Sequence, residues 1–164
     1  MSSTGNSTPA QSPPADAVTD AVLTASRLLV GVSARSIAAI DDSITIPQFR
    51  VLVALYALGP TRPAAVAEIL HVNASHATRM VRRLIAANMV EQRADPMVRQ
   101  EVVLELTEAG ERTVAEVTTQ QHRNIADIVE RMSERQRTYL VDALEAFNVA
   151  GGSDPVPAVP DNWI

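Results

Sequence analysis

The chain has 164 residues, of which 46% are hydrophobic, ample for one domain with a core and an extended helical appendage. The absence of cysteine excludes disulfides, thiolate catalysis and cysteine-based redox sensing. No run approaches the ~18 apolar residues that a bilayer-spanning helix needs, and no signal peptide is recognisable, so we expect a cytoplasmic protein without membrane association.

The charge of the chain is unevenly distributed. The net charge is −5, yet the segment 71–100 carries five arginines and two acids, so it is +3 and the remainder is −8. A protein that binds DNA through one face needs such segregation. The alternative interpretation of the basic segment is an ordinary solvated helix face.

The N-terminal part of the chain predicts a tail followed by a helix. Residues 1–15 are rich in Ser, Thr, Pro and Gly, so we expect disorder there. Between about residues 16 and 40, apolar residues recur at three- and four-residue spacing, which predicts a helix. Asp41-Asp42-Ser43 ends it; this pair of acids is more simply a helix end than a catalytic pair.

Two further helices are predicted between residues 45 and 70. Thr45 or Ile46 lies near the start of the first, with Pro47 in its first turn, and Gly59-Pro60 stops it. Pro63 opens a short helix that ends at Leu70.

A tight turn over residues 70–73 leads into a longer helix. His71 suits the turn because histidine tolerates a left-handed backbone better than most residues. Asn73 is predicted to cap a helix over residues 74–87, and Asn88 suits a left-handed position after it. This order is a helix-turn-helix.

A β-hairpin and two more helices complete the pattern. Strands are predicted from Met89 to Ala94 and from Glu101 to Leu106, joined by a turn at Asp95-Pro96-Met97. Thr107 caps a helix over about 108–131, and Ser133 opens a last helix that ends at Gly151-Gly152. Residues after it have no periodicity, although Trp163 hints that this tail packs on a partner.

The complete pattern resembles the MarR family of winged helix-turn-helix transcriptional regulators, over about residues 17–149. The residues that carry the resemblance are Gln48-Phe49-x-Val51-Leu52, Gly59-Pro60, Pro63, Val66-Ala67-Glu68, Thr78-Arg79 within 72–84, Met89-Val90-Glu91 and Leu106-Thr107-Glu108-Ala109-Gly110. The resemblance implies a mainly α fold with a small β-hairpin. Its expected parts are a disordered tail (1–15), an N-terminal dimerisation helix (16–44), the winged helix-turn-helix DNA-binding domain (45–110), C-terminal dimerisation helices (111–149) and a flexible tail (150–164).

The N-terminal half of the predicted recognition helix is expected to face the base edges in the major groove. Its candidate DNA-binding residues are Asn73, Ala74, Ser75, His76, Thr78 and Arg79. Arg79 is expected to bind guanine through two donors, whereas Arg82 and Arg83 are expected to contact phosphates. Asn73 has the alternative role of a pure helix cap, and His76 that of a surface residue near DNA.

The predicted wing departs from the family. Its members usually carry an Asp-x-Arg pair whose arginine enters the minor groove, but the matching positions here are Val98 and Gln100. We expect Arg99 or Arg93 to take that role, or a wing that barely touches DNA.

The resemblance also implies a cleft for a small anionic or phenolic ligand. The candidate lining residues are Arg27, Arg35, Phe49, Arg50 and Tyr56. Surface ion pairs are the alternative role for these arginines. No metal or other cofactor is expected, because the three histidines (71, 76 and 122) do not form a ligand cluster with carboxylates.

We therefore predict a homodimeric transcriptional regulator of double-stranded DNA, with a pseudo-palindromic operator, that acts as a repressor released by a small-molecule effector. The chain has no phosphate-cradling glycine loop, so no enzymatic activity is predicted. The alternative is a winged-helix interaction module with weakened or nonspecific DNA binding, which the altered wing and the acidic net charge favour.

Overall fold

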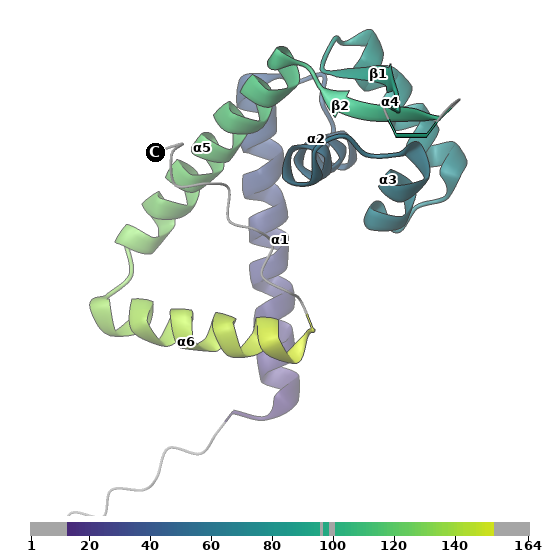
Figure 1. Ribbon diagram of the computed structural model, residues 1–164. Helices are drawn as coiled ribbons and strands as arrows, with labels where there is room; N and C mark the ends of the chain where they lie inside the picture. The colour runs from purple at the N-terminus through teal and green to yellow at the C-terminus, as the bar shows by residue number, and fades with distance from the viewer. Residues whose placement is uncertain (1–12, 96, 99–100, 153–164) are drawn as a thin grey trace, which may run out of the picture. The chain divides into compact units, whose positions relative to one another are not determined.

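The computed structural model describes residues 13–95, 97–98 and 101–152. Within these residues the chain is mainly helical with one small antiparallel hairpin, as the sequence predicts (Figure 1). The elements are α1 (Ala15–Ile40), α2 (Ile46–Leu58), α3 (Pro63–Leu70), α4 (Ala74–Ala86), β1 (Val90–Ala94), β2 (Val102–Leu106), α5 (Glu108–Glu130) and α6 (Glu134–Ala150). Most of the tails predicted at 1–15 and 150–164 lies outside the described residues.

The chain divides into two compact units, residues 1–31 and 32–164. The first unit contains the N-terminal part of α1, and its large apolar side chains are about half exposed. By length and composition alone α1 would be able to cross a membrane, with a mean hydropathy of 1.3 over its most apolar 18-residue window. The expectation that no segment is that long and apolar is therefore wrong. The observation is weak evidence for a membrane, because helices of soluble proteins pass the same test.

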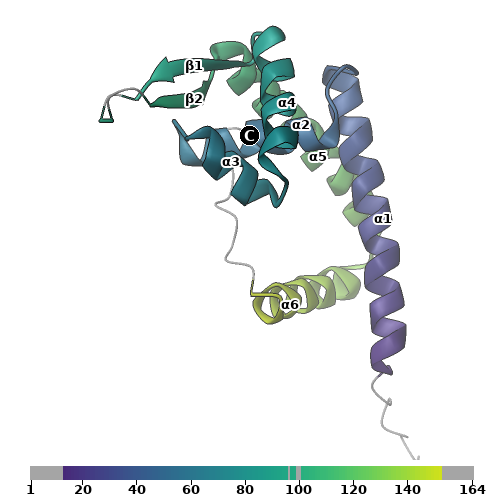
Figure 2. The same cartoon turned by 90° about the vertical axis from the view of Figure 1, so that its right-hand side faces the viewer.

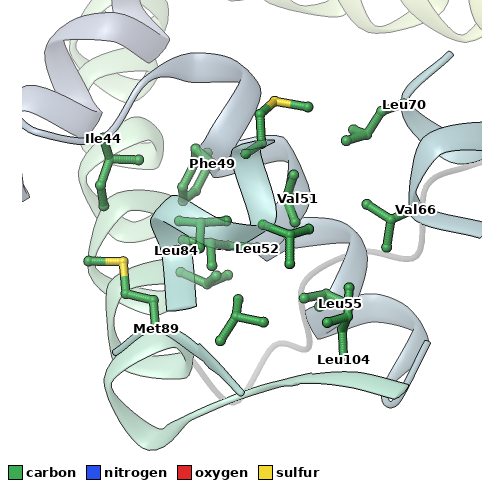
Figure 3. Close-up of a cluster of buried hydrophobic side chains, with 14 of the residues drawn as sticks. Ile44, Phe49, Val51, Leu52, Leu55, Val66, Leu70, Leu84, Met89 and Leu104 are labelled. Carbon is green, nitrogen blue, oxygen red and sulfur yellow. The ribbon is translucent and has the colours of Figure 1, made fainter. Parts of the chain in front are cut away.

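The core of the second unit is built around α2. Val51 and Leu52 are fully buried and Leu55 nearly so, which places one side of this helix in the centre of the hydrophobic cluster shown in Figure 3. The end of α1, α3, α4, both strands and α5 supply buried side chains to the same cluster: Ile37, Val66, Leu84, Val90, Leu104, Val114 and Val117. Burying each such side chain contributes about 1.5–3 kcal/mol, so the burial of this cluster is the largest contribution to the stability of the unit.

Local hydrogen bonds fix the ends of the helices. Thr45 is the N-cap of α2, and a capping box joins it to Gln48: the Thr45 N–H donates to Gln48 Oε1 over 2.9 Å. His71 and Asn88 have φ values of 53° and 57°, so both predictions of a left-handed residue are confirmed. These turns set the directions of α4 and of the hairpin that follows it.

The hairpin pairs Val90 with Leu106 and Gln92 with Leu104, and it lies over α3 (Figure 2). The predicted first strand began one residue too early, at Met89. The Met89 N–H instead donates to the Leu84 carbonyl oxygen over 2.9 Å, which makes this buried residue part of the connection from α4. The second strand begins at Val102 where Glu101 was predicted, and α4 ends at Ala86 where Ala87 was predicted.

Gly110 lies where α5 closely approaches the residue before β1. A Cβ atom on Gly110 would collide with the backbone carbonyl oxygen of Met89, which no side-chain rotation relieves. We expect Gly110→Ala to lower the free energy of unfolding by about 3 kcal/mol, although helix propensity alone predicts stabilisation by up to about 1 kcal/mol. Urea unfolding measures the difference, with Ala109→Gly as the control for propensity; a stabilised Gly110→Ala would contradict the close approach.

Candidate DNA-binding surface

Helix α4 separates its side chains into a buried and an exposed face. Ala77, Met80, Val81 and Leu84 are buried against the core. Their spacing of three and four residues leaves the opposite face to solvent. That exposed face carries Ser75, His76, Thr78, Arg79, Arg82 and Arg83. The structure therefore brings together the residues that the sequence assigns to the recognition helix.

The N-terminus of α4 is capped by Asn73. Its Oδ1 atom accepts a hydrogen bond from the His76 N–H over 2.8 Å, and Asn73 remains exposed. The cap uses only the side-chain oxygen, whereas the NH₂ group is a separate pair of donors. Capping and a contact with DNA are therefore compatible roles for Asn73.

The three arginines of α4 form no salt bridge with any residue that the structure describes. The salt bridges among the described residues involve Arg62, Arg93 and Arg112, and none of them includes Arg79, Arg82 or Arg83. The N-terminal end of the helix adds a partial positive charge of its own. This face is therefore suited electrostatically to a phosphate backbone.

The arginine of β1, Arg93, forms ion pairs, unlike the arginines of α4. Arg93 Nε lies 2.7 Å from Glu105 Oε1, and its terminal nitrogen lies 2.6 Å from Glu91 Oε1. Two carboxylates thus compensate its charge, and a contact with DNA would have to compete with both. The other wing candidate, Arg99, lies outside the described residues, as does Gln100.

Sequence reasoning missed Arg62, a residue outside the hairpin that contacts it. It immediately precedes α3, and its Nε lies 2.9 Å from Glu101 Oε2, while its terminal nitrogen lies 3.5 Å from Asp95 Oδ2. The N–H of Met97 donates to Asp95 and is the main reason that the pKa of this carboxyl lies below its ordinary value. The Val98 N–H and Arg62 lower the pKa further, against a partial burial that raises it. Because 33 residues separate Arg62 from Asp95, no local spacing indicates the contact.

The predicted ligand residues differ in how deeply they are buried. Arg35 and Arg50 are exposed, Phe49 is packed in the core at 6% exposure, and Tyr56 packs partly buried against that core. Arg27 is an exposed residue of the first unit.

A pocket of about 240 Å³ lies between the end of α1 and α5. It is lined by Ile40, Ala115, Glu116, Thr119, Gln120 and Arg123. No group of three or more potential metal ligands is formed by the part of the chain that the structure describes.

The turn between α3 and α4, the exposed face of α4 and the hairpin define a winged helix-turn-helix protein. The sequence model of the MarR family matches residues 44–102. The crystal structure of RV1404 from Mycobacterium tuberculosis is 46% identical, with a TM-score of 0.82, over 87% of this chain and 98% of that one. The chain belongs to the MarR family, as its sequence predicts.

More distant structures share the fold. The transcriptional regulator Tm0710 from Thermotoga maritima is 26% identical, with a TM-score of 0.63, over 80% of this chain and 92% of that one. Apo MarR from E. coli is 18% identical, with a TM-score of 0.68, over 84% of this chain and 98% of that one. A comparison with proteins of curated function gives no match.

The two roles of Asn73 are separable by substitution. Asn73→Ala removes the cap and is expected to lower the free energy of unfolding by about 1 kcal/mol, whereas Asn73→Ser keeps a capping oxygen and most of the stability. If Asn73 also contacts DNA, the serine variant will bind DNA more weakly than the wild type despite its stability. Urea unfolding measures the first effect and fluorescence anisotropy the second. If Asn73→Ser binds DNA with wild-type affinity, Asn73 acts only as a helix cap.

Proposed function

We propose that the protein is a sequence-specific DNA-binding transcriptional regulator. The observation that carries this proposal is the exposed face of α4, on which Arg79, Arg82 and Arg83 form no salt bridge with another described residue. An α-helix fits the major groove of B-DNA, and the acidic remainder of the chain directs DNA to this face. Membership of the MarR family supports the same function.

Residues along α4 are assigned roles by their position. Base edges are contacted by the N-terminal positions: Asn73, Ala74, Ser75, His76, Thr78 and Arg79. Arg79 forks onto a guanine, whereas Arg82 and Arg83, further along the helix, contact phosphates. In the wing, the compensated charge of Arg93 leaves Arg99 as the better candidate for the minor groove.

We propose that the active species is a homodimer that reads a pseudo-palindrome. Both α1 and α6 expose large apolar side chains; on α6 these are Tyr139, Leu140, Val141, Leu144, Phe147 and Val149. An exposed apolar stripe of this kind is typical of a protein–protein interface. Two recognition helices roughly 34–36 Å apart then match successive major grooves. A monomer in sedimentation at micromolar concentration would contradict the homodimer.

The proposed regulator is a cytoplasmic repressor without enzymatic activity, released from DNA by a small anionic or phenolic effector. Arg35 and Arg50 are exposed cations in the second unit, with Tyr56 on α2, and Arg27 is exposed in the first. Phe49 would contact an effector only after repacking, because it is buried in the core.

A second candidate function is a winged-helix interaction module with nonspecific DNA binding. The compensation of Arg93 by Glu91 and Glu105 favours it, because it weakens the electrostatic attraction of the wing for DNA. The exposed arginines of α4 favour the regulator instead.

Fluorescence anisotropy distinguishes the two functions. The purified protein is titrated onto DNA from upstream of its own gene and onto a scrambled duplex, at two salt concentrations. A regulator binds the upstream DNA more tightly and resists competitor. Equal, weak binding that disappears with salt would leave only the nonspecific electrostatic contribution and support the interaction module.

Arg79 and Arg82 are expected to differ in kind. Arg79→Ala should cost roughly 1–3 kcal/mol on the operator and much less on scrambled DNA, because it removes a base contact. Arg82→Ala should weaken binding to both duplexes alike and reduce the salt slope by about 1, because it removes a phosphate contact. Parallel anisotropy titrations measure both, with Arg112→Ala on α5 as the control. If Arg79→Ala loses as much affinity for scrambled DNA as for the operator, Arg79 does not read a base.

A further inference from the structure

The hairpin is attached to the segment before α3 at two levels. Nearer its base, the Thr61 N–H donates to the Leu104 carbonyl oxygen over 2.9 Å, and the Leu104 N–H donates back over 2.8 Å. Further out, the guanidinium of Arg62 contacts Asp95 at the end of one limb and Glu101 at the start of the other. The adjacent residues Thr61 and Arg62 thus hold both the base and the outer part of the wing.

Asp95 connects Arg62 to the wing tip. Its Oδ2 faces the guanidinium, while its Oδ1 accepts hydrogen bonds from the N–H groups of Met97 at 2.8 Å and Val98 at 3.2 Å. The Asp95 N–H donates to the Glu101 carbonyl oxygen over 2.8 Å, which closes the hairpin beneath the tip. Only 10% of the Asp95 side chain is exposed, so these contacts hold it in one place.

We propose that Arg62 is a positioning residue for the wing, which holds the two limbs through Asp95 and Glu101 in the orientation used to bind DNA. This inference rests on the proposed function, because it requires the wing to approach DNA. A guanidinium is suited to the task since its planar array of donors binds two carboxylates at once, whereas a lysine ammonium is a single point charge.

The same contact changes the electrostatics of the wing. The described part of the hairpin and its turn carries four acids, Glu91, Asp95, Glu101 and Glu105, against Arg93. Without Arg62, the negative charges of Asp95 and Glu101 would lose the cation that offsets them. Arg62 therefore both orders the wing and reduces its repulsion from DNA, although it lies outside the hairpin itself.

The first experiment measures wing order without DNA. Amide hydrogen exchange by NMR is recorded for the Asp95 and Glu101 N–H groups in the full-length protein. Arg62→Ala is expected to speed their exchange roughly three- to tenfold, the effect of losing one exposed and one partly buried ion pair, with Arg62→Lys intermediate. Arg112→Ala, which removes the exposed ion pair with Glu108, is the matched control and should leave the wing unchanged. Unchanged exchange in Arg62→Ala would overturn the proposal.

The second experiment separates positioning from direct contact with DNA. Arg62→Ala is compared by anisotropy in the wild-type background and in Asp95→Asn/Glu101→Gln, in which the carboxylate partners are neutral. A positioning role predicts a roughly three- to tenfold loss of affinity in the first background and little further loss in the second. Equal losses in both backgrounds would show that Arg62 contacts DNA directly, and no loss in either would show that wing order does not matter for binding; both would overturn the proposal.

The two experiments also distinguish this proposal from the proposed function. If wild-type protein binds operator and scrambled DNA equally, the regulator is excluded, whereas the role of Arg62 in ordering the wing still stands or falls on the exchange data. If the wild type discriminates and exchange is insensitive to Arg62, only the positioning role is lost.

Discussion

The burial of α2 holds α3, α4, α5 and β2 in place in the second unit. Val51, Leu52 and Leu55 are removed from water by contact with α4, α5 and β2, so the position of the exposed face of α4 follows from packing on its opposite side. Interiors are packed as densely as crystals, and a shift of α2 would be transmitted to α4 and to the hairpin together. The geometry of the candidate DNA surface is therefore fixed by apolar contacts that DNA itself never reaches.

The arginines on α4 and those that contact the hairpin form two groups with different consequences. Arg79, Arg82 and Arg83 sit on a rigid helix, need no partner to be held in place, and keep their charge available. Arg62 and Arg93 lie at the hairpin, and both are bound by carboxylates. A two-stranded hairpin is marginally stable by itself, so ion pairs that order it use up charge that would otherwise attract phosphate. The ion pairs that order the hairpin therefore also lower its positive electrostatic potential toward DNA.

Much of the fold could be predicted from the sequence because its signals are local. Thr45, Asn73 and Ser133 cap helices through bonds to residues three positions away, and His71 and Asn88 adopt the left-handed backbone expected of them. The face of α4 followed from periodicity alone. Each of these features depends on neighbours within one helical turn, where spacing carries the information.

The parts that sequence reasoning missed depend on contacts between distant residues. Nothing near Arg62 shows that Glu101 will lie 2.9 Å away, and an exposed ion pair leaves no periodic pattern. Phe49 was predicted for a ligand cleft as an aromatic residue near arginines, and its place in the core depends on tertiary contacts that the sequence does not show. The apolarity of α1 was underestimated because single charged residues interrupt its runs without lowering the mean hydropathy of the helix very far.

The small number of uncompensated arginines on α4 bears on why two copies are proposed. Three cations on one helix release few counterions, so a single winged domain would bind DNA weakly and with a shallow dependence on salt. Joining two such domains through α1 and α6 makes the second contact intramolecular, and its effective concentration multiplies the affinity without any new contact per domain. The gain is realised only if the helices hold both α4 faces at the spacing of the major groove. Dimerisation through the exposed apolar stripes of α1 and α6 would thus compensate for the weak binding expected from the modest charge of each α4.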